Sequence, residues 1–170
     1  IQYHFGGREG LVNALVARRV ATIESARNAR LDALLEREPA PDVRALLACL
    51  LDPVVELCRD DAGFRAFLSA FGEVALAPGI RLPHNRSDME SLARMREQLR
   101  ALVPVPEAVL AARAEALTRF LLLNLSQRAR SGEPFGGRAF DRFFTNLTDM
   151  GAAMLTADVS AETLAAHDAD

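Results

Sequence analysis

The sequence of 170 residues has no lysine, so all twenty of its basic residues are arginines. A bias of this kind along a whole chain is typical of a GC-rich genome and singles out no individual arginine. Cysteine is also scarce. The only two cysteines, Cys49 and Cys58, lie in one predicted helix. Nine helical residues span roughly 13 Å, which excludes a disulfide between them. We therefore expect buried thiols in a reducing cytoplasm.

Long apolar runs are missing as well. No stretch approaches the roughly 20 apolar residues of a membrane span, and no signal peptide is visible. We therefore expect a cytoplasmic protein with no membrane partner. The sequence begins at Ile1 without a methionine, inside a strongly patterned segment, and we expect it to be a fragment of a longer protein.

The residues that are present indicate a helical domain. Half of them are hydrophobic and a quarter are charged, which excludes disorder as the main state. Helical periodicity runs through nearly everything after Gly7, and no stretch alternates with a period of two for long, so the predicted fold class is all-α. The predicted helices cover residues 8–38, 42–58, 62–76, 88–103, 106–130 and 138–155, with a loop at 77–87 and a polar, flexible tail at 158–170.

The first residues carry the main functional signal. A recognition helix that binds DNA needs polar side chains that reach phosphates and base edges, and an apolar face that packs on the core. Ile1 and Phe5 are four positions apart and share a face. Gln2, Tyr3 and His4 lie mostly off that face, and each ends in a hydrogen-bonding group. This arrangement predicts contacts of these three residues with DNA.

The turn that follows also suits a phosphate. Gly7 can cap the next helix, so the free amides of residues 8–10 can bind a phosphate, and Arg8 adds a positive charge there. Taken singly, these residues also fit an ordinary turn between two helices, and it is the ordered string that favours DNA binding. The predicted DNA-binding residues are Gln2, Tyr3, His4 and Arg8.

The string over residues 1–11 resembles the junction between the recognition helix and the next helix in the tetracycline-repressor (TetR) family. There, an aliphatic residue, two aromatics, His-Phe and a short glycine-rich or polar turn precede Lys-Glu/Asp-x-Leu. The resemblance implies that Tyr3, His4 and Arg8 contact phosphates and that Gln2 contacts a base. Arg8 replaces the usual lysine and keeps its charge. Gln2 replaces the usual aromatic residue, and glutamine can pair bidentately with adenine.

The lengths and order of the later helices agree with the same family. The resemblance implies that residues 1–28 hold the end of a helix-turn-helix domain and the start of a connecting helix. It implies a ligand-binding and dimerisation domain at 29–157, with a homodimer formed by the last two long helices. The final helix favours an interface because it places three Phe, two Met and a close-packing glycine on one stripe. The same stripe also fits packing within one subunit. The predicted dimer-interface residues are Leu117, Leu121, Phe140, Phe143, Phe144, Leu147, Gly151 and Met154.

A ligand site is expected among the central helices. Asn124 is the most pointed clue, because an amide inside a run of leucines must be satisfied if it is buried. A ligand, a water, the partner subunit or the chain itself can satisfy it. The composition of these helices indicates a small, mostly apolar effector. The candidate wall residues are Cys49, Pro53, Phe64, Phe67, Phe71, Met95, Leu99, Phe120 and Asn124.

Nothing in the sequence indicates catalysis, a metal or a cofactor. The three histidines have no metal-ligand spacing, and neither a Ser-His-Asp motif nor a phosphate loop occurs. We therefore expect a bacterial DNA-binding regulator and not an enzyme. The simplest form is a homodimeric repressor that leaves its operator when the effector binds, and an activator fits the same residues. The alternative is an all-α small-molecule-binding protein or enzyme with no DNA role. The fragment by itself is not expected to bind an operator.

Overall fold

In the computed structural model, the chain is described at residues 8–75 and 89–167, with side chains described over 17–72 and 89–166. Both ranges are helical, and neither contains a strand. The all-α prediction is therefore confirmed. The helices are α2 (Arg8–Leu35), α3 (Val43–Asp60), α4 (Ala62–Ala75), α5 (Glu90–Leu102), α6 (Glu107–Ser131), α7 (Gly137–Thr156) and α8 (Ala161–His167).

The helix ends have local causes that the sequence displays. The side chain of Asp42 accepts a hydrogen bond of 2.7 Å from the amide of Ala45 and so caps α3. Pro106 directly precedes α6, where the expectation placed it in the first turn. Gly132 ends α6 with a left-handed φ of 73°, which glycine adopts without steric penalty. The short helix α8 lies in the tail, where no helix was predicted.

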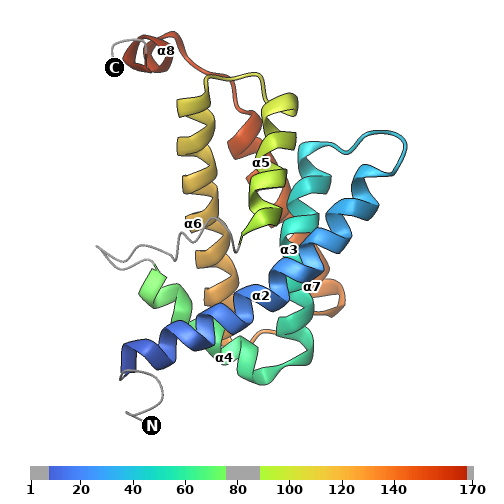
Figure 1. Cartoon of the computed structure of the whole chain (residues 1–170), viewed down its shortest axis with the longest axis vertical. Coiled ribbons are helices and arrows are strands. Elements are labelled where there is room, and N and C mark those ends of the chain that lie inside the picture. The colour runs from blue at the N-terminus through green and yellow to red at the C-terminus, as the bar shows by residue number, and fades with distance from the viewer. Residues whose placement is uncertain (1–7, 76–88, 168–170) are drawn as a thin grey trace.

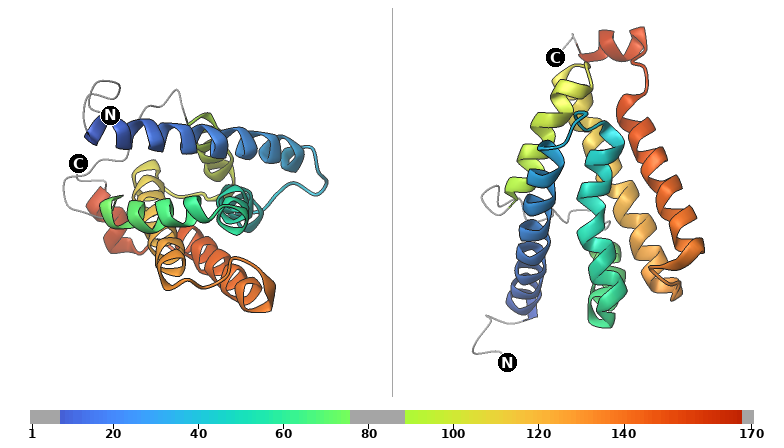
Figure 2. Two further views of the ribbon diagram at one scale, coloured as in Figure 1. Left: turned by 90° about the horizontal axis from the view of Figure 1, so that it is seen from below. Right: turned by 90° about the vertical axis from the view of Figure 1, so that its right-hand side faces the viewer.

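The helices pack around α3 and α6 (Figure 1). Helix α6 packs on α4 and on α7, and α3 packs on α7 and α4. Helices α2 and α5 contact each other and α3. They lie on the opposite side of α3 from α7 (Figure 2). The long helix α2, with 28 residues, therefore runs along the outside of the molecule.

The buried side chains form two clusters. The main cluster joins α3, α4, α6 and α7 with buried residues of the connecting segments, among them Val103 and Phe135. The smaller one, called here the α2–α5 cluster, consists of Leu31, Leu46, Cys49 and Met95. Leu50 and Leu99 are partly buried and pack against both clusters. Helices α2 and α5 therefore share a small core with α3, packed against the main one.

Candidate functional site

The predicted DNA-binding residues are those at the start of the chain. Gln2, Tyr3 and His4 lie outside the described residues. Arg8 is the first residue of α2, and its side chain is not among those described. The predicted loop at 77–87 also lies outside the described residues. The DNA contacts therefore remain predictions from the sequence.

The predicted dimer stripe is mostly the inner core of one chain. The residues that a single chain already buries are Leu117, Leu121, Phe140, Leu147 and Gly151. Phe143, Phe144 and Met154 are partly buried and pack against the same main cluster. Helix α7 turns the stripe towards α3 and α6, so these residues pack within one subunit. A contact of the stripe with a second copy stays a prediction.

Gly151 allows α7 to lie close to its neighbouring helices. A Cβ atom at this position would lie 3.0 Å from Cδ1 of Leu117 and 3.2 Å from Cδ1 of Leu47. The missing side chain therefore lets two helices of the same chain, α6 and α3, come close to α7. The glycine was correctly predicted to mark a crossing, but its neighbours are internal.

The predicted ligand residues are divided between the two clusters. Cys49 and Met95 belong to the α2–α5 cluster, whereas Phe64 is buried in the main one. Pro53 is also fully buried, within α3. Leu99 touches both clusters, so it lies where they meet. Burial raises the pKa of the Cys49 thiol, as expected for a packed cysteine.

The remaining candidates are closer to the surface. Phe67 and Phe71 are half-buried and stack with ring centroids 5.3 Å apart. Phe120 is half-buried against the main cluster. The amide of Asn124 donates to the backbone oxygen of Phe120 at 2.8 Å, so its own helix satisfies it. Asn124 also lines a surface hollow together with Gln127 and Phe143. Of the alternatives for Asn124, a bond within the chain is the one observed.

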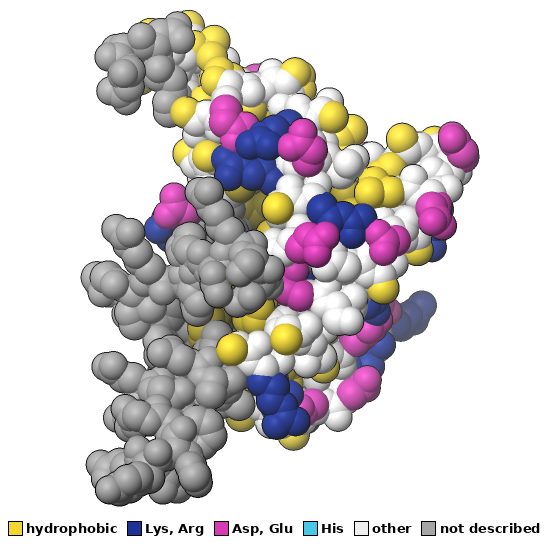
Figure 3. All heavy atoms as spheres, viewed as in Figure 1, with side chains coloured by type: hydrophobic (Ala, Val, Ile, Leu, Met, Phe, Trp, Pro, Cys, Tyr) yellow, Lys and Arg dark blue, Asp and Glu magenta, His cyan; other side chains and the backbone are white. Residues whose placement is uncertain are grey.

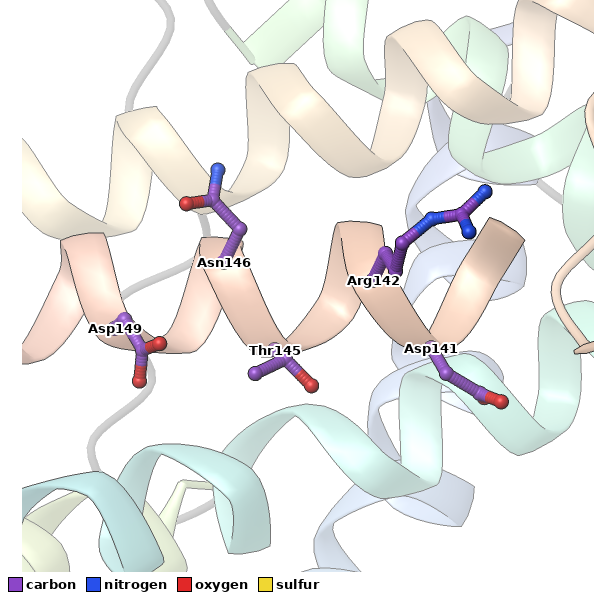
Figure 4. A pocket seen from close by; sticks show the side chains of 5 residues that line it. All are labelled: Asp141, Arg142, Thr145, Asn146 and Asp149. Carbon is purple, nitrogen blue, oxygen red and sulfur yellow. The ribbon is translucent and has the colours of Figure 1, made fainter. Parts of the chain in front are cut away.

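A second hollow runs along the outside of α7 and consists of polar side chains from that helix alone (Figure 4). Arg142 and Asn146 point to one side of it, and Asp141, Thr145 and Asp149 to the other. Asp149 forms an ion pair with Arg44 of α3. None of the predicted ligand residues lines this hollow.

Polar contacts that no sequence pattern indicates hold α2 against the rest of the chain. Nη1 of Arg19 donates to Oδ2 of Asp61 at 2.8 Å, and its guanidinium lies 5.5 Å from the ring centre of Phe64. Oδ1 of Asp61 accepts from the amides of Gly63 and Phe64, at 2.7 and 3.1 Å. The hydrogen bond from Arg19, followed by that from the amide of Phe64, holds the pKa of Asp61 below its usual range. One carboxylate thus joins α2 to the corner between α3 and α4.

A second anchor lies further along α2. Nε of Arg27 donates to the backbone oxygen of Leu50 in α3 at 2.9 Å, and Nη1 lies 3.4 Å from Oε1 of Glu24. Burial lowers the pKa of Arg27, and the neighbouring Glu24 opposes that shift. Arg30 forms an ion pair with Glu56, nearer to solvent. Charged side chains of opposite sign accordingly lie next to one another on this face of the molecule (Figure 3).

Among the residues that the structure describes, no group of histidine, cysteine or acidic side chains could hold a metal ion. In the same part of the chain, no helix has the length and apolar character needed to cross a membrane. No protein-family model, no curated protein and no solved structure matches this chain.

Proposed function

We propose that this chain is the sensing and dimerising part of a DNA-binding transcriptional regulator that resembles the tetracycline-repressor family. The regulator is a homodimeric repressor that a small, mostly apolar molecule releases from its operator. The observation that carries the proposal is the string over residues 1–11, which leads directly into the first turn of α2. That string has the polar tips, the apolar spacing and the capping glycine that a recognition helix and its following turn require.

The contacts that hold α2 against α3 and α4 support a role for α2 in transmitting ligand binding to the DNA-contacting segment. Arg8 begins the helix, and Arg19 and Arg27 fasten it to α3 and to the start of α4. A DNA-contacting segment joined to Arg8 would therefore follow any movement of α2. An apolar effector that enters where the two clusters meet, beside Leu50 and Leu99, would separate α5 from α3 and disturb this seat.

The homodimer is proposed to use the outward face of α6 and α7. Leu123 is 51% exposed and Met150 is 45% exposed in the single chain. The stretch around Leu123 is apolar on nearly all sides, which is typical of a helix buried from several directions. A second copy on this face would cover both side chains and would bring two DNA-reading ends into a two-fold arrangement.

The salt dependence of DNA affinity tests the proposal, using the protein with the helices that the resemblance implies before Ile1. Arg8→Ala is expected to weaken binding to all sequences about equally and to reduce the slope of log K against log salt by about one. Gln2→Ala is expected to relax the preference for a base, at a cost of about 1–3 kcal/mol. Arg37→Ala, at the other end of the α2 region and exposed, is the charge-matched control. Equal effects of Arg8→Ala and Arg37→Ala would contradict the assigned phosphate contact.

A further inference from the structure

The residue before helix α5, Met89, provides no capping side chain. The first amides of a helix have no carbonyl partner within it, and the residue before the helix usually supplies one. Here the amides of Leu92 and Ala93 bond to the backbone oxygen of Met89. The amide of Ser91 needs another acceptor.

Glu24 of α2 provides that acceptor from 67 positions earlier in the chain. Its Oε2 accepts from the amide of Ser91 at 3.0 Å, and its Oε1 accepts from the Ser91 hydroxyl at 2.8 Å. Ser91 is 0% exposed and Glu24 is 7% exposed. Water cannot readily replace either bond, so each group depends on the other.

The groups around this contact link three helices. Arg27, one turn along α2, offsets the charge of Glu24 and is itself held by the backbone of α3. Arg94, one turn along α5, donates to Asn28 at 3.0 Å and to Asp32 at 2.6 Å. The acceptors Glu24, Asn28 and Asp32 recur every four residues and so share one face of α2. The interface between α2 and α5 is therefore polar, and its hydrogen bonds fix the register of one helix against the other.

We propose that Glu24 is a latch that makes the first turn of α5 depend on the position of α2. With α2 seated, the carboxylate closes the start of α5. When α2 shifts out of register, Ser91 loses both partners in a buried place and the first turn of α5 unwinds. In the reverse direction, a displaced α5 leaves Glu24 buried with Arg27 alone, which favours release of α2. The coupling is reciprocal. The regulatory meaning of this coupling rests on the proposed function, in which α2 adjoins the DNA-contacting segment. The coupling between Glu24 and α5 does not depend on that function.

Hydrogen exchange measured by mass spectrometry on this chain, with neither DNA nor effector, tests the latch. Glu24→Gln keeps the size of the side chain and removes one acceptor and the charge. The amides of residues 91–93 are expected to exchange about three to thirty times faster, and those of α7 are expected to stay unchanged. Glu56→Gln, which removes the same charge from another acidic partner of α2, is the matched control and is expected to leave residues 91–93 unaltered.

A rescue separates the latch from a general loss of stability. Met89→Ser gives α5 a local capping hydroxyl, and in the Glu24→Gln background it is expected to return exchange at residues 91–93 to the wild-type rate. Ser91→Ala, which keeps the carboxylate and Arg27, is expected to give a smaller increase in the exchange rate. In the double variant of Glu24→Gln and Ser91→Ala, the increase is expected to be less than the product of the two single increases. Unchanged exchange at residues 91–93 in Glu24→Gln would overturn the proposal. So would an increase spread evenly over all helices, or a failure of Met89→Ser to rescue. Because the measurement needs no operator, it can fail while the proposed function stands, and the reverse also holds.

Discussion

Single carboxylates join one helix to another in this protein, and Glu107 is the clearest exposed example. It is the first residue of α6, and its two oxygens accept from Nε and Nη2 of Arg100 in α5, at 2.8 and 2.9 Å. Arg96 pairs with the same carboxylate. A negative charge at a helix N-terminus is also favoured by the helix dipole. Glu107 therefore fixes the connection between α5 and α6 from the outside.

The stability of the chain in acid is expected to depend on this residue. The hydrogen bond from Arg100, with Arg96 in support, lowers the pKa of Glu107 from 4.5 to about 2. Since the folded state lowers this pKa, the stabilisation is complete above pH 4.5 and is lost as the pH falls towards 2. Urea unfolding across this range should therefore give a smaller decline in Glu107→Gln than in the wild type. Identical pH profiles for the two proteins would count against the assigned contact.

At the scale of elements, the proline and turn residues and the helical periodicity were enough to predict six of the helices to within a few residues. Asp42 and Gly132 mark ends by local chemistry, which a sequence displays. The orientation of α7 was not predictable in the same way. A stripe of Phe, Met and Gly is apolar whether it faces a partner or its own chain, and only the packing on Leu117 and Leu47 decides.

The contacts that hold α2 against the other helices could not be predicted from sequence patterns either. Glu24 and Arg27 look like ordinary residues of a solvated helix face, and their partners Ser91 and Leu50 lie far away in the chain. Such contacts depend on tertiary packing and leave no periodic signal. The candidate ligand residues stay predictions for a related reason, since apolar side chains at helical spacing suit a core as well as a pocket.

Replacing Arg27 should loosen the whole of α2. Arg27→Ala leaves Glu24 buried without its cation and removes the bond to Leu50, so we expect a loss of about 3 kcal/mol in the free energy of unfolding. Arg30→Ala removes the same kind of side chain from an ion pair with Glu56 that is more open to solvent. That control should cost at most about 1 kcal/mol in urea unfolding. Equal losses in the two variants would contradict the assigned seat.

At the scale of the whole molecule, the proposed homodimer predicts that one exposed leucine matters more than another. Leu123→Asp puts a charge into the face of α6 that a second copy is proposed to cover, and sedimentation equilibrium should then show a monomer. Leu102→Asp changes the same residue type in α5, where the side chain is 39% exposed, and should leave the dimer intact. A monomeric wild type, or dissociation by both changes, would rule out this interface.

The most direct test of the central claim is a selection of duplexes from a random DNA library, using the protein with the helices implied before Ile1. The proposed function predicts enrichment of a palindromic sequence with half-sites centred roughly 34–36 Å apart, or a multiple of that spacing. It also predicts that the bound fraction falls when a small apolar effector is added. Recovery of duplexes with no common sequence, at an affinity that depends on salt alone, would contradict it.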